Sequence, residues 1–122
     1  MVELQHGPVP AELLAFLEAH PGAPVDLFND GVFQDAKRAI KAVLNGLQGG
    51  LCVYCEQKLT PTGGQLEHIK PKRGPCARAD LCFAFENLAQ SCNKLGSPTC
   101  GPKKADLELP IEPGPGCNEI WR

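Results

Sequence analysis

The chain has 122 residues, 43% of them apolar, and a formal net charge of -2, a length that suits one domain. No run approaches the roughly 18 consecutive apolar residues that a membrane-spanning helix needs, and the amino terminus lacks the basic-then-apolar order of a secretory signal. We therefore expect a cytoplasmic protein that does not span a membrane.

Charge and cysteine are concentrated in the middle of the chain. Residues 1–50 carry three basic and six acidic side chains, residues 51–104 carry eight and four, and residues 105–122 carry one and four. The basic middle segment also holds six of the seven cysteines. This segment suits a polyanion such as nucleic acid, although a solvated basic face has the same composition.

The first half of the chain predicts two helices. Residues 10–20 begin with a proline suited to a first helical turn and repeat apolar side chains at helical spacing. A second helix is capped by Asn29 or Asp30 and ends at Gly49 and Gly50. Its one-sided apolar stripe comprises Phe33, Ala36, Ile40, Val43, Leu44 and Leu47. We expect this helix to support the segment that follows and not to form the active surface.

The second half predicts short elements in the order strand, strand, helix. Residues 58–60 and 65–69 predict two strands joined by a Pro-Thr-Gly-Gly turn, and residues 85–95 predict a helix. Residues 107–122 hold three prolines and no periodic pattern. We expect this last segment to be an extended tail that wraps over the surface or binds a partner.

Cysteine spacing predicts a metal site. Two residues separate Cys52 from Cys55, which lets two thiolates of one turn reach a tetrahedral metal at about 2.3 Å. Cys92 and Cys100 complete the expected four-cysteine structural zinc, which leaves no coordination position for hydrolysis. Because seven residues between these two is an unusual separation, the fourth ligand stays open, with the substitutes Cys76, Cys82 and Cys117. A redox Cys-x-x-Cys pair and plain buried cysteines are the competing interpretations.

A Glu-His pair at Glu67 and His68 is the candidate reaction centre. A histidine that titrates near neutrality can take a proton from water, and a divalent ion beside it can stabilise the charge that develops on a phosphate. On a regular strand the two side chains point to opposite faces, so both serve one site only if the strand ends or bulges there. An isolated Glu-His pair on the surface, with no function, is the alternative.

Three further polar residues are candidates for this centre. Asn87 lies at the start of the predicted helix, where its amide either caps the helix or holds the backbone or ring around His68. Lys103 and Lys104 are phosphate contacts or part of a polar turn.

The order of these motifs resembles the HNH, or ββα-metal, endonucleases. The matching stretches are Gln-Gly-Gly-Leu-Cys-Val-Tyr-Cys-Glu at 48–56, Leu-Glu-His-Ile-Lys-Pro-Lys at 66–72, Asn-Leu-Ala-Gln-Ser-Cys-Asn at 87–93 and Cys-Gly-Pro-Lys-Lys at 100–104. They are similar to the subgroup that contains PtuB, the nuclease subunit of Septu anti-phage systems and of related retron systems. The resemblance covers roughly residues 1–113.

The resemblance implies an α+β fold in a single domain. A small ββα-metal core at residues 51–105 is stapled by a structural Zn2+, with a helical lead-in at residues 1–50 and an irregular Pro/Gly-rich tail at residues 106–122. The implied activity is hydrolysis of phosphodiester bonds in nucleic acid, in DNA more than in RNA, with Mg2+ or Mn2+. In Septu-like systems the partner is an ABC-type or SMC-like ATPase, which the resemblance also implies here.

The same resemblance implies residue roles. The histidine matching His68 is the general base, the asparagine matching Asn87 positions it, and the acid matching Glu67 binds the catalytic metal. Gly101 stands where many of these enzymes have His or Asn, which leaves three candidates for the third catalytic position: Asn93, Lys103 and Lys104. Gly101 also favours the second function considered, a non-catalytic zinc-ribbon adaptor that recruits nucleic acid or protein.

Overall fold

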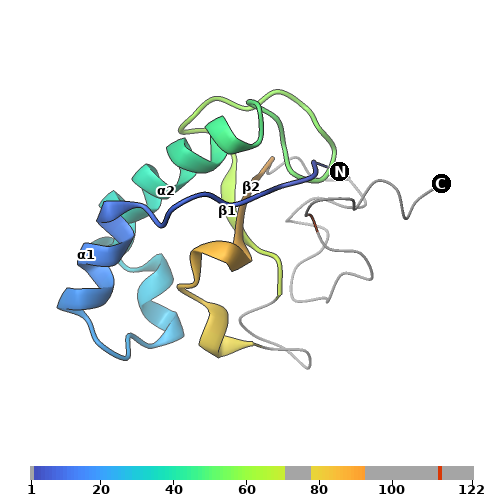
Figure 1. Cartoon of the computed structure of the whole chain (residues 1–122). Helices are drawn as coiled ribbons and strands as arrows, with labels where there is room; N and C mark the ends of the chain where they lie inside the picture. The colour runs from blue at the N-terminus through green and yellow to red at the C-terminus, as the bar shows by residue number, and fades with distance from the viewer. Residues whose placement is uncertain (1, 71–77, 93–112, 114–122) are drawn as a thin grey trace.

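Helices and a two-stranded sheet build the described part of the protein (Figure 1). The structure, a computed structural model, describes residues 2–70, 78–92 and 113. The α-helices and strands are α1 (Ala11–Ala19), α2 (Gln34–Leu47), β1 (Gln65–His68) and β2 (Leu88–Ser91). Short 3-10 helices lie at Val25–Asn29, Gly31–Phe33, Ala79–Leu81 and Phe85–Asn87.

Both predicted helices are confirmed. Pro10 immediately precedes the first turn of α1, as its sequence predicts. The segment before α2 begins with a 3-10 turn, where the Asp30 carboxylate accepts a hydrogen bond from Val32 N at 3.0 Å. The α-helix therefore starts later than predicted. Beyond Leu47, positive φ angles of +66° at Gly49 and +75° at Gly50 reverse the chain.

The predicted order of the second half is wrong. β1 forms where a strand is expected, but residues 58–60 contribute only an isolated bridge between Lys58 and Leu51. The first part of the predicted helix, up to residue 92, is instead a 3-10 turn followed by β2. All four residues of β2 are buried, and the strand packs against α2 as well as pairing with β1. These tertiary contacts override the local helical pattern.

The two strands pair antiparallel, with Gln65 opposite Ser91 and His68 opposite Leu88. Gly64 permits this pairing to begin. Its φ is +61°, and a Cβ atom built there would lie 2.2 Å from the Ser91 carbonyl oxygen. Only glycine fits such a close approach. With helices and a small sheet together, the α+β class is confirmed.

One hydrophobic cluster joins the two halves of the chain. Helices α1 and α2 pack together, and α2 also contacts both strands. The apolar stripe of α2 is buried at Ala36, Ile40 and Leu44, whereas Val43 and Leu47 are exposed. An aromatic group within the cluster combines lead-in residues with one residue near the sheet: Phe16, Phe28, Phe33 and Phe83.

The N-terminal segment lies across β2, as Figure 1 shows for the stretch before α1. Val2 N donates to Val53 O at 2.8 Å, within the cysteine turn, the turn between Cys52 and Cys55. His6 Nε2 donates to Leu88 O at 2.7 Å. The described part of the chain contains no helix with the length and apolar character needed to cross a membrane.

Candidate metal centre and active site

Three of the four predicted zinc ligands converge. The sulfur atoms of Cys52, Cys55 and Cys92 all lie within 4.8 Å of one another, and those of Cys55 and Cys92 are 3.7 Å apart. A tetrahedral zinc with bonds of about 2.3 Å holds its sulfur ligands roughly 3.8 Å apart. The donor set therefore fits a structural zinc, and the gathering of three thiols favours a metal over a two-cysteine redox pair.

Backbone hydrogen bonds shape this sulfur cluster. Glu56 N donates to Cys52 O at 3.0 Å and closes the turn, while Val53 N donates to Gln90 O at 3.0 Å and ties the turn to β2. Cys92 N donates to Cys52 Sγ at 3.2 Å. Burial raises the pKa of the Cys52 thiol, but hydrogen bonds from backbone N–H groups outweigh it and leave that pKa below its ordinary value. The fold therefore favours the thiolate, the form that binds metal.

The remaining cysteines do not complete the cluster within the described residues. Cys100, the predicted fourth ligand, lies outside them, as do the substitutes Cys76 and Cys117. Cys82 is described and buried, but it is not a member of the cluster. Its backbone carbonyl contacts His68 instead.

Buried amide side chains connect the sulfur cluster to α2, a feature that the sequence analysis missed. Gln48 Nε2 donates to Leu51 O and to Gln90 O, both at 2.8 Å, and Gln48 Oε1 accepts from Gln90 N at 2.8 Å. Asn45 Nδ2 donates to Gln90 Oε1 at 3.0 Å. Gln90 Nε2 in turn donates to Thr60 O and Gly63 O. The signal for this network in the sequence was Asn45, an amide residue on the buried face of the predicted second helix.

His68 ends β1 with its ring in a defined orientation. Its Nε2 lies 2.9 Å from the carbonyl oxygen of Cys82. Because a carbonyl only accepts hydrogen bonds, Nε2 carries the proton, and in the neutral ring Nδ1 then has the lone pair. The ring packs against Phe28, with 4.3 Å between the ring centroids. The geometry suits a base that accepts a proton at Nδ1.

Glu67 is buried beside this histidine. One carboxylate oxygen accepts a hydrogen bond from His68 N at 3.0 Å. Both residues belong to the paired part of β1, which ends at His68. Within residues 2–70, 78–92 and 113, the three cysteines form the only cluster of at least three potential metal ligands. A single carboxylate nevertheless suits Mg2+, which usually keeps several waters and binds substrate phosphate as well.

Asn87 holds the backbone that follows β1. Its Oδ1 accepts from Lys70 N at 2.8 Å, and its Nδ2 donates to Lys70 O at 3.0 Å. Its own carbonyl oxygen accepts from Ile69 N at 2.8 Å. The helix-cap alternative is wrong, because Asn87 ends a 3-10 turn and β2 follows. The amide thus fixes the chain just beyond His68.

The other predicted members of the reaction centre, Asn93, Lys103 and Lys104, lie outside the described residues.

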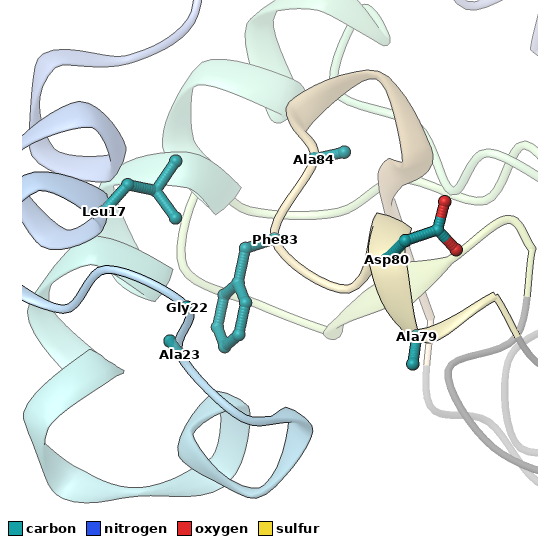
Figure 2. A pocket seen from close by; sticks show the side chains of 7 residues that line it. All are labelled: Leu17, Gly22, Ala23, Ala79, Asp80, Phe83 and Ala84. Carbon is teal, nitrogen blue, oxygen red and sulfur yellow. The ribbon is translucent and has the colours of Figure 1, made fainter.

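A separate hollow of about 440 Å³ lies between α1 and the segment before β2, and Figure 2 shows its lining. The lining is mostly apolar, except for Asp80. A hydrogen bond from Arg78 lowers the pKa of Asp80, which also forms a 3.0 Å ion pair with that guanidinium. His68, Glu67 and Asn87 do not line this hollow.

No protein-family model matches the chain, and no solved structure matches it. The chain is 41% identical over 122 aligned positions to a protein of Vibrio cholerae serotype O1 biovar El Tor named "Retron Vc95 putative HNH endonuclease". The alignment covers 97% of this chain and 60% of that relative, so the chain spans less than two thirds of the relative's length. This similarity confirms the likeness to HNH endonucleases that the cysteine, Glu-His and Asn motifs predict.

Proposed function

We propose that the protein is a metal-dependent HNH endonuclease that hydrolyses phosphodiester bonds of nucleic acid, DNA more than RNA. The observation that carries the proposal is the orientation of His68, whose Nε2 donates to Cys82 O and whose Nδ1 is the basic nitrogen. Glu67 accepts a hydrogen bond from the backbone N of His68, and Asn87 binds the backbone of Lys70, two residues after His68. The relative named as an HNH endonuclease supports the same activity.

In the proposed reaction, His68 Nδ1 takes a proton from water, whose oxygen then attacks the phosphorus. The bond from phosphorus to one sugar oxygen breaks, and the departing oxygen takes a proton from solvent. Asn87 holds the Lys70 backbone and thereby the end of β1 that carries the base. Glu67 is the residue that would hold Mg2+ or Mn2+, and the ion would stabilise the negative charge that develops on the phosphate. Lys104 is the third catalytic position in this proposal, ahead of Asn93 and Lys103.

The sulfur cluster has a structural role in this proposal. Cys52, Cys55 and Cys92 bind Zn2+ with Cys100 as the fourth ligand, and a closed four-cysteine site performs no hydrolysis. The zinc core at residues 51–105 is preceded by the lead-in at residues 1–50 and followed by the tail at residues 106–122. The basic residues of the core suit contact with the nucleic-acid backbone.

The first experiment compares wild type with His68→Ala on plasmid DNA and on single-stranded RNA, in Mg2+ or Mn2+, at matched zinc content. We expect wild type to cut and His68→Ala to lose about 100-fold or more of the rate, as loss of a general base does. His20→Ala is the matched control, because His20 stacks on Phe16 at the end of α1 and lies outside the proposed centre. It should cut like wild type.

Two other outcomes would point elsewhere. If wild type and His68→Ala both bind nucleic acid equally and neither cuts, the zinc-ribbon adaptor becomes the better function. If His68→Ala cuts at the wild-type rate, the nuclease stands but His68 is not its base.

The biological setting is a separate part of the proposal. The name of the relative places that protein in a retron, which supports a role for this chain as the effector subunit of a PtuB-like anti-phage complex, as in Septu systems. We propose an ABC-type or SMC-like ATPase of the PtuA kind as the partner, docked on the acidic lead-in and the tail, in the cytoplasm. Deleting residues 107–122 should reduce co-purification of that ATPase. Unchanged co-purification would contradict docking on the tail.

A further inference from the structure

We infer that Phe28, in the helical lead-in, is a positioning residue that holds the imidazole of His68 in its reactive orientation. The inference rests on the proposed function, in which His68 is the general base, and it adds a residue outside the zinc core to that reaction centre. Phe28 lies in the 3-10 helix Val25–Asn29, before α2, and is 3% exposed. Its ring centroid lies 4.3 Å from that of His68, with 54° between the ring planes.

The His68 ring needs such a contact. The second side-chain torsion of histidine is broad and roughly two-fold, so its own rotamer preference does not select one ring orientation. Only one of the two orientations keeps Nε2 at 2.9 Å from Cys82 O. A rotation by half a turn exchanges a ring nitrogen for a carbon at that carbonyl and moves Nδ1 away from its place. Phe28 packs on the ring and restricts this rotation.

Phe28 is itself firmly held. Its ring contacts those of Phe33 and Phe83, at centroid distances of 5.2 and 6.1 Å. The ammonium of Lys37, on α2, lies 4.4 Å from the centroid of Phe28, a cation–π contact, and donates to Asn29 Oδ1 at 3.1 Å. α2 and the rings of Phe33 and Phe83 therefore fix the surface against which His68 rests. The lead-in contributes to the reaction centre and does more than support the core.

The test uses Phe28→Leu and Phe28→Met, which keep the position apolar but remove the flat ring. Phe16→Leu is the matched control, because Phe16 belongs to the same aromatic group and is buried, but its ring contacts are to Phe33, Phe83 and His20. All three variants are compared with wild type at equal zinc content. Thermal unfolding is recorded for each, so that loss of stability is separated from loss of positioning.

Kinetics provide the first readout. We expect both Phe28 variants to lose about tenfold in kcat with KM within about twofold of wild type, since the base is misplaced while the contacts to substrate remain. Phe16→Leu should lower the melting temperature and leave kcat unchanged. An equal loss of kcat in Phe16→Leu would overturn the inference, because general loosening of the core would then explain the effect.

Nitrogen NMR of 15N-histidine-labelled protein provides a second readout that needs no activity. The chain has three histidines, and the His68 signals are those missing from His68→Gln. At a pH where the rings are neutral, wild type should show His68 with the proton on Nε2 alone. Both Phe28 variants should show a mixture of the two tautomers, and Phe16→Leu should match wild type.

The two proposals fail differently. If wild type cuts no substrate, the proposed function fails, while the tautomer comparison still decides whether Phe28 orients His68. If wild type cuts and the Phe28 variants retain both wild-type kcat and a single tautomer, the inference is wrong and the proposed function stands. If one Phe28 variant does not fold, the other variant alone decides the test. If that folded variant shows the single wild-type tautomer of His68, the inference is wrong.

Discussion

The helical lead-in and the cysteine–hairpin half (residues 51–92) are stabilised in different ways. In the lead-in, fully buried apolar side chains such as Leu13, Ile40 and Leu44 fill the space between α1 and α2. The cysteine–hairpin half contributes apolar side chains such as Leu66 and Leu88 to the same core, but it adds three converging sulfur atoms and buried amides such as Gln90. Apolar burial spreads stability over many similar contacts, whereas the sulfur atoms and amides are a few groups that no other residue type replaces.

The largest effect should follow removal of zinc. Structural zinc sites contribute about 10–16 kcal/mol of apparent binding free energy, which is comparable to the whole stability of a small domain. We therefore expect a strong chelator, or Cys52→Ser, to abolish the cooperative thermal transition seen by circular dichroism. Mass spectrometry of the native protein should record the loss of one zinc. A chelated sample that keeps its melting temperature would show that the cysteine–hairpin half is stable without metal.

A core substitution in the lead-in should have the next largest effect. Leu44→Ala removes a side chain with 0% exposure and should lower the free energy of unfolding by about 2–5 kcal/mol. Leu47→Ala, one turn later on α2 at 39% exposure, should cost less than about 1 kcal/mol. Urea denaturation of the zinc-loaded protein measures both. Equal costs would mean that burial does not distinguish these two positions.

Gly64→Ala tests the junction between the cysteine turn and β1. The new Cβ must move away from Ser91 O, and the positive φ adds strain, so we expect a cost of about 2 kcal/mol. Gly22→Ala is the control, because its φ of +67° is similar but no atom lies within 4 Å of the added carbon. The difference between the two variants measures the close approach alone. Zinc affinity should fall only in Gly64→Ala, since Ser91 precedes Cys92, a proposed zinc ligand.

The smallest effect should come from the amide network. Gln90→Leu leaves the carbonyl groups of Thr60 and Gly63 without this donor and should cost about 1–2 kcal/mol. Gln57→Leu, at an exposed side chain, should change the free energy of unfolding by less than about 0.5 kcal/mol. A competition assay with a chromophoric chelator should show weaker zinc binding in Gln90→Leu. Unchanged zinc affinity would mean that the network stabilises α2 without shaping the metal site.

The difference between the two halves also explains which predictions held. The periodic apolar residues of α1 and α2 are a local signal, so both helices follow from the sequence. The residues of β2 lie within the stretch 85–95, whose local pattern predicts a helix, and that local signal was wrong. Their strand conformation depends on β1, which is more than twenty residues earlier in the chain, and on packing against α2.

The candidate site divides in the same way. The spacing of Cys52 and Cys55 and the Glu-His pair were visible in the sequence because each is formed by near neighbours in the chain. The hydrogen bond from His68 to Cys82 O and the packing of Phe28 on the imidazole were not, and the sequence left open whether Asn87 caps a helix or holds the backbone near His68. Each joins residues that are far apart in sequence, so it depends on how the elements pack.

The sequence by itself therefore determined the helices, the type of metal ligand and the likeness to a family, because residue type and local spacing carry those properties. Only the tertiary structure decided the identity of β2, the hydrogen bond between His68 and Cys82 O and the ring contact between Phe28 of the lead-in and His68. The physical reason is that hydrogen bonds and ring contacts act over a few ångströms in space, and folding alone brings those atoms within that distance.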